Sequence, residues 1–266
     1  RQGYICHSSY HVVMTKHLTV LTGGSRGLGL AMAQQLLKRG DTLLCISRQT
    51  SDTLPAFAEA AGATLLQWSQ DLAHGDKAST RLEQWLHTQA DKEFTHVTLI
   101  NNAGVIGRIE PLSQTDTVDL AHSLRVGLEA PMQLTAAFLR ATGDWHCERS
   151  VLNISSGLGR RPMASQAAYC AAKAGLDHFT RCLALDEAGK PFGAKVCSLA
   201  PGVIDTDMQV QLRSARPELF PDQAGFASLK SQGQLISPEA AAGHVLAYLA
   251  RPDFGSQSVA DVRDAG

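Results

Sequence analysis

The sequence has no Cys-x-x-Cys pair, no group of cysteines or histidines with the spacing of metal ligands, and no long apolar run. A membrane-spanning helix needs about 20 consecutive apolar residues, so the pattern predicts no contact with a membrane. The six cysteines are scattered along the chain, which is typical of reduced thiols in a cytoplasmic protein. We therefore expect a cytoplasmic protein without a bound metal.

An excess of charge of one sign is also missing. The 24 basic and 25 acidic residues leave a formal net charge of −1. Proteins that bind nucleic acid or anionic lipid need a basic field, so we expect neither partner. Hydrophobic residues make up 44% of the chain and charged residues 18%, which is ordinary usage for a globular protein with a core. The expected partner is a small molecule.

Six apolar runs of strand length alternate with longer helical patterns. Continuous apolar strands that alternate with helices indicate a parallel sheet covered on both faces. No linker, shift in composition or internal repeat divides the chain. We predict a single doubly wound, Rossmann-type α/β domain with a parallel sheet of about seven strands. The strand-like runs are 18–23, 42–47, 63–68, 96–101, 150–155 and 194–200, and the helical stretches include 28–38, 115–140 and 165–187.

Two segments depart from this alternation. Residues 1–13 have no clear period, and we interpret them as an N-terminal extension, either an expression remnant or a misplaced start, ahead of a domain over 14–266. Residues 207–236 form a long irregular connection, which predicts a lid over a substrate. A helix should follow, because Ser237 suits the N-cap and Pro238 the first helical position.

A glycine-rich turn follows the first predicted strand. Gly23, Gly27 and Gly29 would allow a tight turn, a close approach of backbone to a phosphate, and close packing of helix on strand. The helix N-terminus adds N–H groups and a partial positive charge. Such a turn is weak evidence alone, but after the first strand of an alternating chain it predicts a dinucleotide site.

The end of the second predicted strand indicates which dinucleotide binds. NAD sites usually place a carboxylate there for the ribose 2′-hydroxyl, whereas this chain has Ser47 and Arg48. Arg26, in the glycine turn, could reach the same place. Two guanidinium groups suit a 2′-phosphate, so we predict NADPH as the cofactor. The alternative is that Arg48 is merely solvated.

A serine, a tyrosine and a lysine form a candidate catalytic group. Tyr169 and Lys173 are four residues apart and share a helix face. The pKa of a free phenol is near 10, and a nearby ammonium and an oxidised nicotinamide would lower it. Ser156, at the end of a strand, could bind the same substrate oxygen. Because Tyr-x-x-x-Lys also occurs by chance, an ordinary amphipathic helix is the alternative.

Further motifs stand in order around this group. Over residues 17–265 the chain resembles the short-chain dehydrogenase/reductase family, through the motifs TGGSRGLG (22–29), QDL (70–72), NNAG (101–104), NISS (153–156), YCAAK (169–173) and PGVIDT (201–206). Within the family it is most similar to sepiapterin reductases and bacterial benzil-type diketone reductases, over 201–209, 229–239 and 253–265.

The resemblance implies a role for each site residue. Tyr169 would protonate the carbonyl oxygen, Ser156 would orient and polarise the carbonyl, and Lys173 would lower the tyrosine pKa and bind the nicotinamide ribose. The expected cofactor residues are Gly23, Ser25, Arg26, Gly27, Leu28, Gly29, Arg48, Asp71, Leu72, Asn102, Ala103, Gly104, Tyr169, Lys173, Pro201, Gly202, Ile204 and Thr206. The expected substrate residues are Ser156, Gly157, Leu158, Met208 and Asp261.

The two similar enzyme groups share a ketone beside another oxygen. The resemblance therefore implies NADPH-dependent reduction of a vicinal dicarbonyl or an α-hydroxyketone. In sepiapterin reductases an aspartate near the C-terminus anchors the pterin, and the tails align it with Asp261. A solvated tail residue is the alternative, and Asp264 could replace it. A generic carbonyl reductase acting on acyl-thioesters, steroids or sugars, and a non-catalytic NADP sensor, remain alternative functions.

Three further expectations concern positions around this site. Gly127 stands where many family members have an asparagine; glycine keeps the main-chain carbonyl and permits a local kink, so we expect a working proton relay. Asn101 and Asn153 are either structural strand-end residues or cofactor contacts. By resemblance, the helices at 115–140 and 165–187 would pair in a homodimer or homotetramer.

Overall fold

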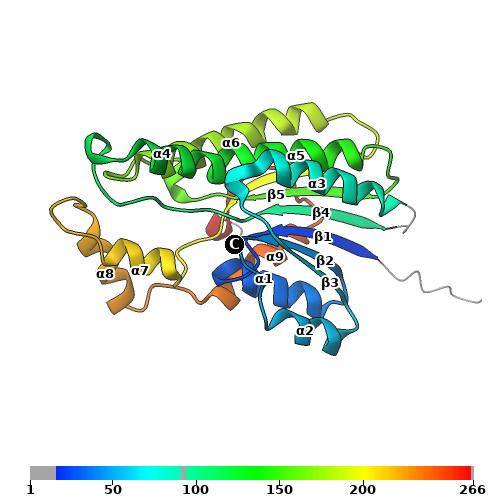
Figure 1. The fold of residues 1–266 in the computed structure, drawn as a ribbon, viewed down its shortest axis with the longest axis horizontal. Coiled ribbons are helices and arrows are strands. Elements are labelled where there is room, and N and C mark those ends of the chain that lie inside the picture. Colours follow the sequence, from blue (N-terminus) through cyan, green and yellow to red (C-terminus); the bar gives the residue numbers. More distant parts are fainter. Residues whose placement is uncertain (1–15, 91–93, 265–266) are drawn as a thin grey trace, which may run out of the picture.

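The computed structural model describes residues 16–90 and 94–264, so the prediction for residues 1–13 lies outside the described residues. In the described ranges seven parallel strands form one sheet in the order β3-β2-β1-β4-β5-β6-β7, with helices on both faces (Figure 1). This confirms the predicted fold class. The strands are β1 (His17–Thr22), β2 (Thr42–Ser47), β3 (Thr64–Ser69), β4 (His96–Asn101), β5 (Glu148–Ile154), β6 (Lys195–Ala200) and β7 (Val259–Asp261).

The central strands are apolar on both sides because both faces of the sheet are covered. In β1, Leu18 and Val20 belong to the core on one face, whereas Leu21 belongs to the core on the other. Helices α1 (Gly27–Lys38), α2 (Leu54–Ala61) and α9 (Pro238–Leu249) cover the face of Leu21, and α3 (Gly75–His87), α5 (Ala130–Ala141) and α6 (Ala167–Glu187) cover the other.

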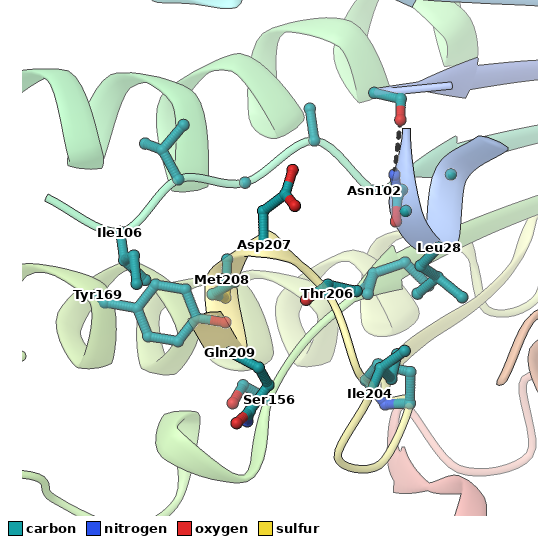
Figure 2. Close-up of a pocket in the computed structure, with 18 of the residues that line it drawn as sticks. Leu28, Asn102, Ile106, Ser156, Tyr169, Ile204, Thr206, Asp207, Met208 and Gln209 are labelled. Carbon is teal, nitrogen blue, oxygen red and sulfur yellow. Dashed lines mark hydrogen bonds between the residues drawn. The ribbon is translucent and has the colours of Figure 1, made fainter. Parts of the chain in front are cut away.

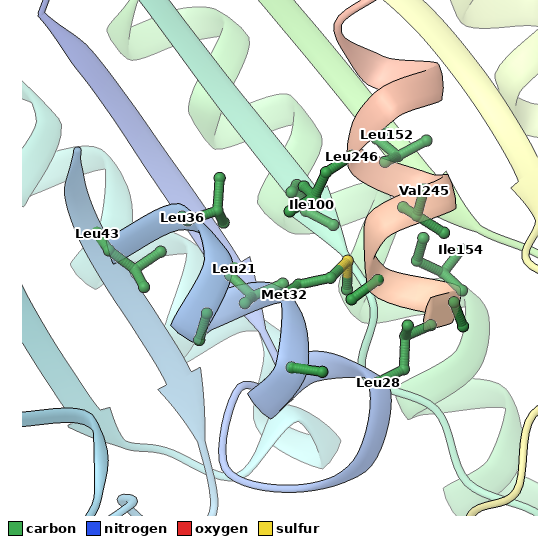
Figure 3. Close-up of a cluster of buried hydrophobic side chains, with 14 of the residues drawn as sticks. Leu21, Leu28, Met32, Leu36, Leu43, Ile100, Leu152, Ile154, Val245 and Leu246 are labelled. Atoms are coloured by element: carbon green, nitrogen blue, oxygen red, sulfur yellow. The ribbon is translucent and has the colours of Figure 1, made fainter. Parts of the chain in front are cut away.

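The core beneath α1 and α9 fixes the helix that follows the glycine turn. Met32 of α1 and Val245 of α9 are both fully buried among side chains of the central strands (Figure 3). Helix α9 begins where the sequence predicts, because the Ser237 hydroxyl accepts a hydrogen bond from the Ala240 N–H at 3.2 Å.

The stretch expected as one helix over 115–140 is interrupted. Helix α4 (Thr117–Leu124) passes through a π-helical turn at Arg125–Glu129 into α5. Gly127 lies buried in that turn, and a Cβ added there would be 3.0 Å from the Cβ of Ala172 on α6. The expected local kink therefore takes the form of a π turn, a feature frequent at functional sites.

The expected lid region is not irregular throughout. It contains α7 (Asp207–Arg213) and α8 (Gln223–Ser231), which lie beyond the carboxyl ends of the strands (Figure 1). Its last residue, Ile236, forms a parallel bridge with Ile204, three residues before the region begins. The Asp205 carboxylate pairs with Lys230 of α8 and lies 3.5 Å from Nη1 of Arg213. These ion pairs thus hold both helices against the segment that follows β6.

The described ranges also settle two smaller points. The five cysteines within them (Cys45, Cys147, Cys170, Cys182 and Cys197) are free thiols. None of the helices in these ranges combines the length and hydropathy that crossing a bilayer requires.

Candidate active site

A cavity of about 1360 Å³ lies at the carboxyl ends of the strands, roofed on one side by α7 and α8. Doubly wound sheets bind ligands in this location, at the point where the order of the strands along the sheet reverses. Every cofactor- and substrate-binding residue predicted from the sequence lines this cavity. The fold therefore brings together motifs that are up to 238 positions apart, from Gly23 to Asp261.

The glycine turn occupies one end of the cavity. Gly23 has φ +70°, a conformation that L side chains rarely adopt. A Cβ at Gly29 would lie 2.0 Å from the carbonyl oxygen of Gly23, so α1 can pack against the turn only through a glycine. Helix α1 begins at Gly27, with its N-terminus at the cavity. This cradle fits the phosphates of a dinucleotide.

Thr22 and Asn102 tie the ends of β1 and β4 together. The Thr22 hydroxyl accepts hydrogen bonds from the N–H groups of Asn102 at 2.9 Å and Ala103 at 3.0 Å. The Asn102 side chain, labelled in Figure 2, donates from Nδ2 to the Thr22 carbonyl at 3.0 Å. The NNAG segment is therefore held rigidly against the glycine turn.

Asn101 and Asn153 are structural strand-end residues, the first of the two alternatives considered from the sequence. Asn101 Nδ2 donates to Asn153 Oδ1 at 2.9 Å and to the Thr135 hydroxyl at 3.1 Å, and Asn153 Nδ2 donates to the Thr180 hydroxyl at 2.8 Å. Both asparagines are buried, and neither lines the cavity. They join two strands to the helices α5 and α6 behind the site.

Two arginines stand at the end of the cavity where the adenosine of a dinucleotide would lie. Arg48 is exposed at the end of β2, and Arg26 is exposed in the glycine turn. Arg26 pairs with Asp207 at the start of α7, at 3.3 Å. Asp71 caps the next turn by accepting from the Ala73 N–H at 2.9 Å.

Ser156, Tyr169 and Lys173 meet at the other end of the cavity. Ser156 Oγ accepts a hydrogen bond from the Leu158 N–H at 3.1 Å. Lys173 Nζ lies 5.7 Å from the centre of the Tyr169 ring and donates to the Ile154 carbonyl at 2.7 Å. In Figure 2 the Tyr169 hydroxyl points into the cavity. A substrate oxygen placed there would face a phenol and a serine hydroxyl.

Burial dominates the pKa values of this group. It raises the pKa of Tyr169 to about 12, although hydrogen bonding with Ser156 opposes the rise. It lowers the pKa of Lys173 to about 8, although the charge of Asp177 opposes the fall. In the protein alone burial thus determines the direction of the tyrosine pKa shift, and the lowering by the lysine and the cofactor stays a prediction. Lys173 Nζ is turned to the Ile154 carbonyl, to which it donates its hydrogen bond.

Asp177 was not singled out from the sequence. Its carboxylate is 1% exposed and accepts hydrogen bonds from the hydroxyls of Ser155 at 2.5 Å and Ser198 at 2.6 Å. Arg160 pairs with it at 3.3 Å. Its position four residues after Lys173 was an available signal, since such residues share a helix face. The carboxylate links the end of β5, which carries Ser156, to β6 and α6.

Asp261 lies at the cavity, but its carboxylate is engaged. It is 4% exposed, and Arg263 donates to it from Nε at 2.8 Å and from Nη2 at 2.6 Å. This bidentate pair holds the pKa of Asp261 below its usual value. Asp264 is exposed and does not line the cavity.

The family model described as short chain dehydrogenase matches residues 17–217. This chain belongs to the short-chain dehydrogenase/reductase family. It is 35% identical over 235 residues to a benzil reductase ((S)-benzoin forming) of Bacillus cereus, covering 88% of this chain and 94% of that protein.

Two further relatives agree with this assignment. Sepiapterin reductase of Bos taurus is 31% identical over 263 residues, covering 93% of this chain and 94% of the relative. A short-chain dehydrogenase/reductase crystal structure from Burkholderia vietnamiensis is 31% identical, with a TM-score of 0.62 over 94% of this chain and 99% of that one. As a family member, the chain is an oxidoreductase of the carbonyl reductase class that acts on CH–OH groups.

For this short-chain dehydrogenase/reductase the sequence predicted the lid and Met208, but it did not single out four further lid residues. Gln209 and Leu212 of α7 and Phe226 and Leu229 of α8 all line the cavity. Gln209 and Leu229 fall within the similar segments 201–209 and 229–239, but no pattern marks any of the four as a cavity residue, because their placement depends on how α7 and α8 fold back over the sheet.

Proposed function

We propose that this protein uses NADPH to reduce a vicinal dicarbonyl or an α-hydroxyketone to an alcohol. The observation that carries the proposal is the convergence of Ser156, Tyr169 and Lys173 in one cavity with a glycine cradle. The likeness to proteins named benzil reductase and sepiapterin reductase supports the substrate class. Benzil is itself a vicinal diketone.

NADPH would lie along the cavity from the glycine turn to Tyr169, and when bound it supplies the hydride. The close contact of Gly29 with Gly23 leaves backbone N–H groups to receive its pyrophosphate. Arg26 and Arg48 would bind the 2′-phosphate. Arg26 would exchange its exposed partner Asp207 for that phosphate, because an ion pair this exposed contributes little to stability.

Tyr169 would deliver the proton to the carbonyl oxygen. With a pKa of about 12 it stays protonated at neutral pH, which suits a donor in the direction of reduction. The Ser156 oxygen already accepts from the Leu158 N–H, so its O–H would turn from Tyr169 to donate to the same carbonyl oxygen. Lys173, held by Ile154 and the Asp177 charge, would bind the ribose and favour negative charge developing on the phenol oxygen.

Pterin recognition by Asp261 would require Arg263 to move. The two N–H donors of Arg263 occupy both carboxylate oxygens, the arrangement a pterin's amino-pyrimidine would otherwise make. If Asp261 anchors a pterin, the rate of sepiapterin reduction should therefore rise in Arg263→Ala and fall in Asp261→Asn. If both variants reduce sepiapterin as the unaltered protein does, Asp261 is no pterin anchor.

The same proposal includes a homodimer or homotetramer. Val118 of α4 and Leu185 of α6 are large apolar side chains exposed to 72% and 78% on the helices expected to pair. Pairing of these helices between subunits would bury both side chains. Light scattering should give the mass of a dimer or tetramer; a monomer at all concentrations would contradict this.

Consumption of NADPH with benzil, an aliphatic diketone, sepiapterin and a 3-oxoacyl thioester tests the function directly. We expect steady turnover of the diketones, (S)-benzoin from benzil, and slower turnover with NADH. Preference for the thioester would favour a generic carbonyl reductase. Tight NADPH binding without turnover of any carbonyl compound would favour a sensor.

A further inference from the structure

Gln209 is a buried polar residue on the inner face of the lid. On helix α7, Asp207 and Val210 are exposed, whereas Gln209 and Leu212, three residues apart, are only 7% and 6% exposed. Both buried side chains line the cavity. The buried face of the helix therefore carries one amide, beside the apolar Leu212, at the wall of the cavity.

The amide oxygen of Gln209 has no protein partner. Oε1 is buried, and no hydrogen bond reaches it from any residue in the ranges 16–90 and 94–264. Leaving such an atom unsatisfied costs about 1–3 kcal/mol, and a leucine at this position would avoid that cost. Unsatisfied buried groups of this kind are uncommon and require an explanation. A ligand that completes the hydrogen bond explains the glutamine.

Its location indicates which ligand. Of the described cavity residues, Ser47, Gln209 and Arg213 carry buried polar atoms without a hydrogen bond. Ser47 ends β2 on the adenosine side, and Arg213 has the charge of Asp205 at 3.5 Å. Gln209 instead faces the part of the cavity that contains Ser156 and Tyr169, as Figure 2 shows.

We propose that Gln209 recognises the oxygen on the carbon next to the reacting ketone. A rotation of the side chain brings the covered Oε1 to a hydroxyl in that place, and a half-turn of the amide presents Nε2 to a carbonyl instead. One residue thereby serves both α-hydroxyketones and vicinal diketones. A ketone without the neighbouring oxygen leaves the amide unpaired, and sites of this kind discriminate strongly against such analogues. This inference rests on the proposed function.

Three ketones that differ only at the neighbouring carbon test it: propiophenone, 2-hydroxypropiophenone and 1-phenyl-1,2-propanedione. In Gln209→Leu, kcat/KM for the two oxygenated ketones should fall about tenfold relative to propiophenone, the value of one hydrogen bond. Gln211→Leu is the matched control, because Gln211 lies on the same helix but faces out and donates to the Gly107 carbonyl at 3.1 Å. Its selectivity should stay unchanged.

The outcomes separate the inference from the proposed function. Unchanged selectivity in Gln209→Leu, in a protein that reduces the ketones, overturns only the role of Gln209. A raised KM for NADPH with unchanged selectivity would mean that the Gln209 amide binds the cofactor, and this result also overturns its role in substrate recognition. If the unaltered protein reduces none of the three ketones or the diketones named above, the proposed function fails and the inference fails with it.

Discussion

Asp177 lies one helical turn from Lys173 on α6, buried to 1% exposure, and its charge raises the lysine pKa against the effect of burial. Lys173 has a pKa of about 8, so its charge is present below that pH and lost above it. We expect kcat/KM for ketone reduction to fall as the pH rises through about 8. In Asp177→Asn the lysine pKa drops further, so the fall should begin at lower pH.

Two variants separate charge from structure in that experiment. Ser198→Ala removes a hydrogen bond to Asp177 but keeps its charge, and Asp186→Asn removes an exposed carboxylate from the same helix. Neither should move the alkaline limb of the pH profile. An unmoved limb in a folded Asp177→Asn protein would refute the electrostatic role of Asp177.

Gly29→Ala should damage the nucleotide site. The added Cβ would lie 2.0 Å from the Gly23 carbonyl oxygen, so α1 or the glycine turn must shift. We expect a loss of about 1–3 kcal/mol in the free energy of unfolding, the usual cost of overpacking, and weaker NADPH binding. Gly225→Ala is the control, because nothing lies within 4 Å of its added Cβ. Equal melting temperatures and NADPH affinities in the two variants would contradict the claim that close packing of Gly29 on Gly23 forms the nucleotide site.

Arg48→Ala should change cofactor preference. Losing a charge-assisted bond of about 1.5–3 kcal/mol weakens NADPH binding roughly ten- to a hundredfold, and NADH, which lacks the 2′-phosphate, is spared. Binding titrations with both nucleotides measure this. Arg39→Ala, an exposed arginine at the far end of α1, should leave both affinities unchanged. A parallel loss of NADH binding in Arg48→Ala would argue against 2′-phosphate recognition.

Gly127→Asn should not improve the enzyme. Its Cβ would lie 3.0 Å from that of Ala172, which forces α6 and the π turn apart. We expect a loss of about 1–3 kcal/mol in the free energy of unfolding and no gain in turnover. Thermal melts and kcat measure both. A higher kcat in Gly127→Asn would mean that the proton relay needs the asparagine side chain and is impaired by Gly127.

The sequence predicts the fold and one side of the site because local patterns determine them. The glycine turn and the apolar strand runs depend on spacing within a few residues, and their elements appear within one or two residues of their expected ends. Strand β7 was missing from the expected runs because only Val259–Asp261 pairs with β6, too short a segment for a periodic signal.

Other features depend on contacts between distant segments. The raised pKa of Tyr169 follows from burial, which no motif encodes. The engagement of Asp261 by Arg263 and the inward turn of Gln209 follow from how the tail and the lid fold back.

Reduction of benzil by the unaltered protein and by Tyr169→Phe, followed as consumption of NADPH, tests the central claim most directly. The account predicts steady turnover by the unaltered protein and a loss of at least about a hundredfold in kcat in the variant, because proton transfer is removed. NADPH binding should be retained. Full benzil reduction by Tyr169→Phe would contradict the assignment of Tyr169 as the proton donor.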